Sequence, residues 1–366
     1  MIKSALGIAV SVVALLVAAP AAQAATSSAT KTSSKKHSVK KSHARYKAGH
    51  AHHASARTSS GSSKAAKTAH GNHKSGYQHV AFSPAPEVHA APPVMTAGDL
   101  AGLNLTHDPL ALRSNAAVVI DQATSQVLFD KNSAVALPIA SLTKLMTATI
   151  VVEAHQNMDE VLEVTSDDID RERNSTSRLR VGSKMTRSNM LHIALMSSEN
   201  RAASALGRNY PGGLPAFVAA MNAKAKALGM NDTRYVDSTG LSSQNVSSAR
   251  DLSRLVVAAY QHPIIREYST DTRYVVDTGG HRQLQYINSN RLVMNPGWEI
   301  GLQKTGYIAE AGRCLLMQTT VNGRRVVMVF LDSKGKDSRL ADAGRVRRWL
   351  EISKPQALTP AAAHQG

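Results

Sequence analysis

The sequence predicts an α+β protein with a central antiparallel sheet flanked by helices and an inserted helical lobe. Two observations lead to this class. Strand-like segments occur near both ends of the folded part of the chain, at 116–129 and 313–331, and helical patterns fill most of the sequence between them. A sheet built by joining the two ends would leave the helices as an insertion, with a cleft where sheet and lobe meet.

The first predicted elements are a hairpin and a helix. The apolar runs "AAVVI" at 116–120 and "SQVLF" at 125–129 flank four residues that are typical of a turn region. A helix is expected from near Ser141, and "VLEVT" at 161–165 has the pattern of a strand. The helical patterns of the lobe cover 188–208, 215–230 and 248–260.

The last predicted elements are two strands and a helix. The runs "RCLLMQTTV" at 313–321 and "RRVVMVFL" at 324–331 flank Asn322-Gly323, a pair strongly favoured in two-residue hairpin turns. An amphipathic helix over 337–352 is expected to close the fold. Its apolar side is formed by Leu340, Val346, Trp349 and Leu350.

Residues 1–24 have the pattern of a secretory signal peptide. Lys3 supplies the positive charge, an apolar core follows, and the small residues Ala22 and Ala24 predict cleavage after Ala24. An uncleaved anchor helix is the alternative, but the apolar core is short for a membrane span of about 20 residues. We therefore expect export, with no membrane span after cleavage.

A basic tract follows the predicted signal peptide. Residues 25–86 contain no Asp or Glu but eleven Lys or Arg, so that this tract carries most of the formal net charge of +17. Because it offers few apolar residues to bury, we expect 25–112, which ends in a Pro-containing linker, to be disordered. The tract either binds an anionic cell-envelope polymer or acts as a solvated linker, and export argues against nucleic acid as a partner.

The folded part is expected to be one domain over 113–352, followed by a flexible tail over 353–366. The single cysteine, Cys314, excludes an intramolecular disulfide and lies in an apolar run, where we interpret it as a core residue. The histidines of the basic tract are too irregularly spaced for a defined metal site. No metal or other cofactor is therefore predicted.

Ser141 and Lys144 lie three positions apart at the start of the first predicted helix. Residues at this spacing share a helix face, so that the lysine amine can reach the serine hydroxyl. A serine becomes a good nucleophile only beside a base, and a lysine can be that base only when burial or a nearby cation keeps it neutral. Taken alone, such a pair is more often a capping serine and a surface lysine.

Two further motifs favour catalysis. Ser198 and Asn200 form an S-x-N triplet at the end of an apolar helix, where they could relay a proton and orient a substrate amide, although helix capping is the alternative. Lys304, Thr305 and Gly306 form a K-T-G triplet on a predicted strand. The lysine and the threonine hydroxyl can hold a carboxylate, and the glycine lets a substrate backbone lie against the strand.

The order S-x-x-K, S-x-N, K-T-G is the signature of active-site serine penicillin-recognising enzymes. With "ALMSSENRAA", "STGLSSQNVSSARDL" and "KTGYIAEAGRCL", the chain from about 118 to 352 resembles the low-molecular-mass penicillin-binding proteins of the D-alanyl-D-alanine endopeptidase type. The resemblance implies a penicillin-binding/β-lactamase-like fold, a periplasmic location and no metal. It also implies peptidoglycan stem peptides and β-lactams as ligands.

The resemblance further implies a role in acylation for three residues. Ser141 would attack the carbonyl of a D-alanyl bond and form an acyl-enzyme, and Lys144 would act as the base. The oxyanion hole would consist of the backbone N–H groups of Ser141 and Tyr307. Water would then hydrolyse the ester.

For the other motif residues, the resemblance implies roles in substrate binding and proton transfer. Ser198 would pass the proton to the leaving amine. Asn200 would hold the substrate amide and keep the two motif lysines in register. Lys304 and Thr305, followed by Gly306, would bind the carboxylate of the substrate or of a β-lactam.

Members of this family differ in the leaving group that they release, and the sequence leaves several functions open. We favour an endopeptidase that cuts D-alanyl–diaminopimelate cross-links, because the 60 residues after Gly306 leave no room for the extra C-terminal domain and anchor of typical carboxypeptidases. A carboxypeptidase acting on pentapeptides is the alternative. A β-lactamase would need a glutamate for deacylation, and Glu160, Glu163 and Glu199 match no such motif. A non-catalytic wall-binding module conflicts with the intact motifs.

Overall fold

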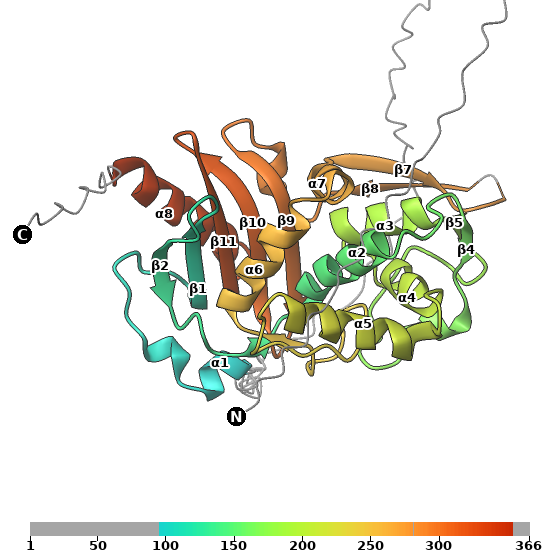
Figure 1. Ribbon diagram of the computed structural model, residues 1–366, viewed down its shortest axis with the longest axis horizontal. Coiled ribbons are helices and arrows are strands. Elements are labelled where there is room, and N and C mark those ends of the chain that lie inside the picture. The colour runs from blue at the N-terminus through green and yellow to red at the C-terminus, as the bar shows by residue number, and fades with distance from the viewer. Residues whose placement is uncertain (1–94, 281, 354–366) are drawn as a thin grey trace, which may run out of the picture. The chain divides into compact units, whose positions relative to one another are not determined.

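The computed structural model describes residues 95–353 except His281. The predicted signal peptide, most of the basic tract and linker, and residues 354–366 of the predicted tail lie outside the described residues. Within the part that is described, no helix is both long and apolar enough to cross a membrane. These residues form the α+β fold that the sequence predicts, with one large antiparallel sheet beside a helical lobe (Figure 1).

The large sheet joins the two ends of the described chain. Its strand order is β2-β1-β11-β10-β9, and all neighbouring strands are antiparallel. Both predicted hairpins are confirmed, and Asn322 and Gly323 both have the positive φ that their tight turn requires. The strands are β1 (Ser114–Asp121), β2 (Val127–Lys131), β9 (Glu299–Ile308), β10 (Gly312–Val321) and β11 (Arg324–Ser333).

The helices divide between the lobe and the two faces of the sheet (Figure 1). Helix α6 contacts β1 and β11, and the closing helix α8 contacts β10 and β11. The segment predicted as helical over 188–208 is interrupted at 197–199, where Ser198 adopts a positive φ. The α-helices are α1 (Ala97–Leu100), α2 (Thr143–Glu153), α3 (Arg187–Met196), α4 (Asn200–Arg208), α5 (Gly213–Ala227), α6 (Ala249–Ala259), α7 (Pro263–Thr270) and α8 (Ser338–Ile352).

Three short strand pairs complete the lobe and its edges. Only the first three residues of the strand predicted at 161–165 pair with another strand. The hairpin of β7 and β8 was not predicted, because its strands are short and mix polar with apolar residues. The pairs are β3 (Leu137–Pro138) with β6 (Val246–Ser247), β4 (Val161–Glu163) with β5 (Lys184–Thr186), and β7 (Arg273–Asp277) with β8 (Gln283–Ile287).

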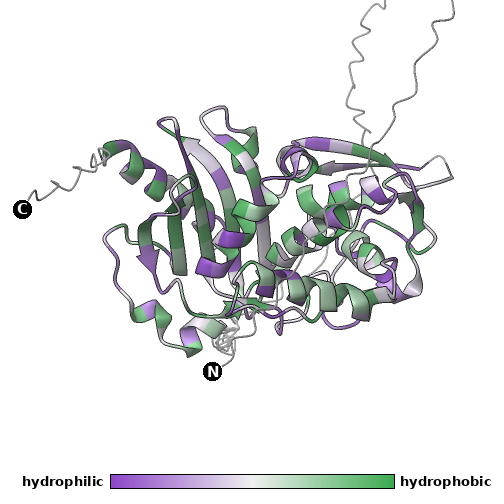
Figure 2. Ribbon diagram, in the orientation of Figure 1, coloured by the Kyte–Doolittle hydropathy of each residue, from purple (hydrophilic) through white to green (hydrophobic). Residues whose placement is uncertain are grey.

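Two apolar cores lie on opposite faces of the large sheet. Because side chains alternate along a strand, Val118 of β1 joins the larger core, which extends into the lobe, whereas Val119 joins the smaller core beneath α8. The apolar side predicted for the closing helix packs against the smaller core, with Val346 buried and its neighbours half-buried. Cys314 is buried as predicted, and burial raises the pKa of its thiol to about 12. Figure 2 shows hydrophobic residues along the central strands and the lobe helices.

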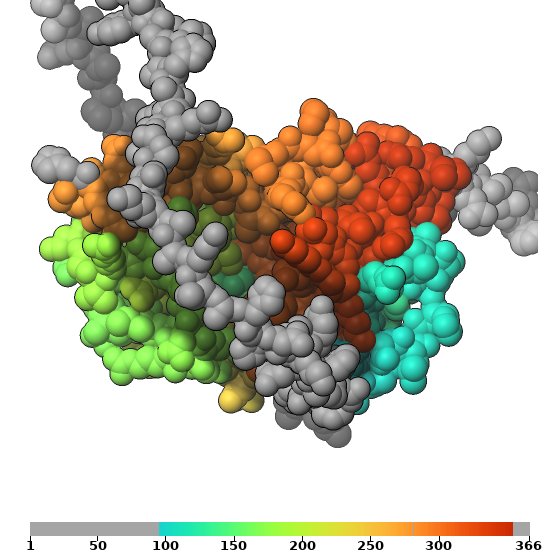
Figure 3. Space-filling view, turned by 180° about the vertical axis from the view of Figure 1, so that it is seen from behind, coloured from blue at the N-terminus to red at the C-terminus, as the bar shows by residue number. Residues whose placement is uncertain are grey.

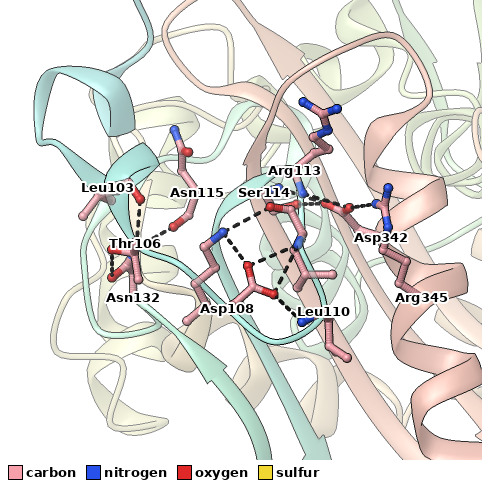
Figure 4. Close-up of polar contacts among 12 residues, drawn as sticks. Leu103, Thr106, Asp108, Leu110, Arg113, Ser114, Asn115, Asn132, Asp342 and Arg345 are labelled. Carbon is pink, nitrogen blue, oxygen red and sulfur yellow. Dashed lines mark hydrogen bonds and ion pairs between the residues drawn. The ribbon is translucent and has the colours of Figure 1, made fainter.

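Polar contacts fix the first described residues to the sheet and to α8. Asp108 accepts hydrogen bonds from Lys131 Nζ (2.8 Å) and from the backbone N–H groups that follow it (Figure 4). Asp342 of α8 accepts from the backbone N–H and the hydroxyl of Ser114 and pairs with Arg345. The backbone N–H of Gly98 donates to Asp332 of β11 at 3.1 Å, so that residues near 100 and the C-terminal elements lie side by side, as Figure 3 shows from behind.

Candidate active site

A tight contact between two turns places Ser141. Ser141 lies in the 3-10 turn Ala140–Leu142, directly before α2. Gly240, with a φ of 80°, packs so closely on this turn that a Cβ at its position would lie 2.0 Å from the carbonyl oxygen of Ala140. The Thr143 hydroxyl donates to the same carbonyl oxygen at 2.8 Å. The backbone that carries Ser141 is therefore fixed from two sides, and only glycine fits at position 240.

Lys144 is buried on the first turn of α2 and meets three oxygen atoms. Its Nζ lies 2.9 Å from Ser141 Oγ, 2.8 Å from Asn200 Oδ1 and 2.6 Å from the carbonyl oxygen of Thr239. A neutral amine has two N–H groups and one lone pair. The amide and the carbonyl can only accept, so they take the two N–H groups. The lone pair of neutral Lys144 then faces the Ser141 hydroxyl, which can donate its proton to it.

The surroundings of Lys144 favour this neutral form. Burial lowers the pKa of Lys144 to about 7, and the negative charges of Asp237 and Glu199 oppose the shift only in part. Its direct partners are an amide and a carbonyl, which stabilise an ammonium less than a carboxylate would. A substantial fraction of Lys144 is therefore available as a base at neutral pH.

The turn that presents the Thr239 carbonyl is held by one carboxylate. Asp237 accepts hydrogen bonds from the backbone N–H groups of Thr239 (2.5 Å), Gly240 (2.6 Å) and Ser242 (3.1 Å). Sequence reasoning missed this contribution, because the acceptor is a backbone atom and has no side-chain signature. The signal available was "STGL", which was noted only as part of the family resemblance.

The S-x-N triplet connects α3 to α4. Asn200 is the first residue of α4, and its Nδ2 donates to the Ser175 hydroxyl at 3.1 Å, which leaves Oδ1 for Lys144. Ser198 lies in the left-handed region with a φ of 67°. Among the described residues, its hydroxyl makes no hydrogen bond with Ser141 or Lys144. The structure thus joins Asn200 directly to the Ser141–Lys144 pair, whereas it shows no such contact for Ser198 among the described residues.

The glutamates considered for deacylation have structural contacts. Glu199 is buried, accepts from the Ser177 hydroxyl at 2.6 Å and caps the N-terminus of α4. Glu163 pairs with Lys184, and Glu160 pairs with Arg187. None of them contacts Ser141 or Lys144 among the described residues, so the structure adds no support for a β-lactamase.

Strand β9 forms the opposite wall of the site and is the edge strand of the sheet. A Cβ at Gly306 would lie 3.0 Å from the carbonyl oxygen of Ile139 and 3.1 Å from the backbone nitrogen of Ser141. Strand β9 therefore lies directly against the turn that carries Ser141. Tyr307 is the next residue along this strand after Gly306.

The K-T-G residues are all buried but have different partners. Lys304 is fully buried, and its Nζ donates to the carbonyl oxygen of Thr305 at 2.8 Å. Burial lowers its pKa well below the usual value, and the charges of Lys144 and Arg339 add to the shift. The hydroxyl of Thr305 lies 2.7 Å from that of Ser289, a contact not predicted from the sequence. Arg339 of α8 donates to the carbonyl oxygen of Gly306 at 3.0 Å.

A cavity of about 480 Å³ opens beside these motifs. It contains Ser198 and Asn200 of the S-x-N triplet and Ser289, the partner of Thr305. Among the residues that the structure describes, no cluster of His, Cys, Asp and Glu has the arrangement of a metal site. The other residues that line the cavity are Thr176, Arg178, Ser197, Glu199, Gln285, Tyr286 and Ile287.

The comparisons of this chain with a family, with relatives and with solved structures agree with one another. A family described as D-alanyl-D-alanine carboxypeptidase matches residues 103–335. The chain is 48% identical over 285 residues to a D-alanyl-D-alanine endopeptidase of Pseudomonas aeruginosa, covering 78% of this chain and 89% of that protein. A D-alanyl-D-alanine endopeptidase of Escherichia coli is 45% identical over 254 residues, covering 69% and 81%. Penicillin-binding protein D2 of Listeria monocytogenes, solved in a cefotaxime-bound form, superposes with a TM-score of 0.60 at 27% identity, covering 68% of this chain and all of that one.

Proposed function

The chain belongs to the D-alanyl-D-alanine carboxypeptidase family of serine hydrolases, and on this premise we propose that it is an endopeptidase that cuts D-alanyl–diaminopimelate cross-links in peptidoglycan. The observation that carries the chemistry is the contact of the buried Lys144 amine with the Ser141 hydroxyl. Two relatives at 48% and 45% identity, both named endopeptidases, support cross-links rather than terminal D-alanine as the substrate.

The first step of the proposed reaction forms an acyl-enzyme. Ser141 Oγ attacks the carbonyl carbon of the D-alanyl residue while its proton passes to the lone pair of Lys144. The carbonyl oxygen becomes negatively charged and is stabilised by the backbone N–H groups of Ser141 and Tyr307. The position of β9 against the Ser141 turn supports this role for Tyr307.

The second step releases the diaminopimelate amine. The C–N bond breaks, and the amine takes the proton of the Ser198 hydroxyl. The proton that Lys144 accepted in the first step then passes to Ser198. Thr305, with the buried Lys304 amine behind it, holds the carboxylate next to the cleaved bond, and Asn200 holds the substrate amide. Water then attacks the ester with Lys144 as the base and frees Ser141.

The same geometry accounts for inhibition by β-lactams. A β-lactam carbonyl placed in the oxyanion hole would acylate Ser141 in the same way, and the antibiotic carboxylate would bind at Thr305. The cefotaxime-bound Listeria structure has the same fold. We further propose that the protein acts in the periplasm after removal of residues 1–24, and that its basic tract binds an anionic envelope polymer.

Purified protein incubated with cross-linked muropeptide dimers and with pentapeptide monomers tests this proposal. We expect dimers to be converted to monomers, and this activity to be lost in Ser141→Ala together with covalent labelling by a fluorescent penicillin. Trimming of pentapeptides with dimers left intact would instead establish the carboxypeptidase alternative. Folded protein that takes no label would refute the enzymatic proposal.

A further inference from the structure

The cavity beside the S-x-N triplet is larger than a carboxypeptidase reaction needs. A leaving D-alanine requires room for one methyl group and one carboxylate. The cavity holds about 480 Å³, within the range of about 300–1,000 Å³ that is typical of small-molecule sites. Its lining includes Tyr286 and Ile287 in addition to the polar residues.

The cavity lies on the side of the site from which the amine leaves. Ser198, which gives the amine its proton in the proposed reaction, lines it. Ser289 also lines it and contacts the hydroxyl of Thr305, which holds the carboxylate next to the cleaved bond. A second cavity, of about 700 Å³, is lined by Tyr307 and Ala309 at the C-terminal end of β9 and shares no residue with the first. The contacts of the first cavity with Ser198 and, through Ser289, with Thr305 assign it to the leaving group.

Arg178 is the cationic side chain that lines the first cavity. Its guanidinium carbon lies 4.1 Å from the ring centre of Tyr286, and Nη1 donates to the carbonyl oxygen of Gln285 at 2.6 Å. The Tyr286 ring is buried, and its hydroxyl lies 3.4 Å from a carboxylate oxygen of Glu199. These contacts hold the guanidinium at the cavity, and among the described residues only one of its five N–H donors has an acceptor. Within residues 95–353, His281 excepted, no acidic side chain forms an ion pair with Arg178.

We propose that this cavity receives the acceptor stem peptide, and that Arg178 determines specificity by binding one of its carboxylates. The inference rests on the proposed endopeptidase function. Diaminopimelate continues from the cleaved amine through three methylene groups to a second amino-acid centre, which carries the rest of the stem and its acidic groups. The methylene groups fit beside Tyr286 and Ile287, and a carboxylate beyond them meets a guanidinium suited to bidentate binding.

The variant Arg178→Gln tests this assignment, and Arg180→Gln is its matched control. Arg180 is an exposed arginine of the same loop that does not line the cavity. We expect Arg178→Gln to lower kcat/KM for cleavage of muropeptide dimers roughly ten-fold, as the loss of a charge-assisted hydrogen bond predicts. Acylation by a fluorescent penicillin, which has no acceptor stem, should change less than two-fold. Arg180→Gln should change neither rate.

A second substrate sharpens the test. Dimers in which the acceptor-stem carboxyl groups beyond the cleaved residue are amidated should be poor substrates for the unmodified protein. In Arg178→Gln, the same amidation should have no further effect. Unchanged dimer cleavage by Arg178→Gln, or equal losses in cleavage and penicillin acylation, would overturn the cavity assignment while leaving the endopeptidase function intact. Failure of the unmodified protein to cleave dimers would refute the proposed function and the assignment together.

Discussion

Two buried lysines in this molecule have opposite environments. Lys131 of β2 lies 2.8 Å from the buried carboxylate of Asp108, so that its positive charge is compensated (Figure 4). Lys144 of α2 is buried even more completely, but its partners are a hydroxyl, an amide oxygen and a backbone carbonyl. Burial therefore lowers the pKa of Lys144 to about 7.

Because their partners differ, Lys131 stabilises the fold, whereas Lys144 can act as a base. A carboxylate partner favours the charged form and ties the side chain to the native structure. Neutral acceptors orient the amine without fixing its charge, so that it can exchange a proton near pH 7. Burial alone would not distinguish the two residues, because the partner decides the role.

Replacing Lys144 should have the largest effect. In Lys144→Met, the Ser141 hydroxyl has no base, and we expect the rate of acylation by a fluorescent penicillin to fall by about 10³-fold. Stopped-flow fluorescence measures the rate, and circular dichroism establishes that the variant is folded. Acylation within ten-fold of the unmodified protein would show that another group acts as the base.

Giving Lys144 an acidic partner should make it resemble Lys131. In Asn200→Asp, a carboxylate replaces the amide 2.8 Å from Nζ, and we expect the pKa that governs acylation to rise by roughly 1.5 units. Less neutral lysine is then present at pH 7, so the rate there should fall roughly 15-fold. The control Asn200→Ala should lower the rate without raising that pKa. An unshifted pH profile in Asn200→Asp would contradict the comparison.

Removing the structural lysine should affect stability but not catalysis. Lys131→Met leaves the buried Asp108 carboxylate with only backbone donors, and we expect the free energy of unfolding to fall by about 3 kcal/mol. Urea unfolding measures this loss. The acylation rate of the folded variant should stay within two-fold of the unmodified protein, and a larger decrease would mean that the two regions are coupled.

Disturbing the contact of Gly240 with the Ser141 turn should have a smaller effect. Gly240→Ala places a Cβ against the Ala140 carbonyl and should cost about 2 kcal/mol more than Gly229→Ala. Gly229 is a matched control because its φ is also positive but the space around it is open. Thermal unfolding compares the variants, and equal losses would show that the Gly240 contact does not fix the Ser141 turn.

The sequence predicts most of the sheet and the motif residues, but it does not predict which atoms contact those residues in the folded protein. Ser141 and Lys144 are recognisable because their spacing and order relative to the other motifs are rare. The Thr239 carbonyl, and Ser175 and Ser289 as partners of motif residues, could not be foreseen, because contacts between distant loops have no local pattern. The β7–β8 hairpin was missed for a similar reason, since its short strands owe their structure to packing on the lobe.

The pH dependence of Ser141 acylation tests the central claim most directly. Because the folded protein holds the pKa of Lys144 near 7, the fraction of neutral base grows as pH rises through that value. We predict that the rate constant for labelling by a fluorescent penicillin increases about ten-fold per unit below pH 7 and reaches a plateau above it. A rate that is constant from pH 5 to 9, or that begins to rise only near the usual pKa of an exposed lysine at about 10.4, would contradict the assignment of neutral Lys144 as the base.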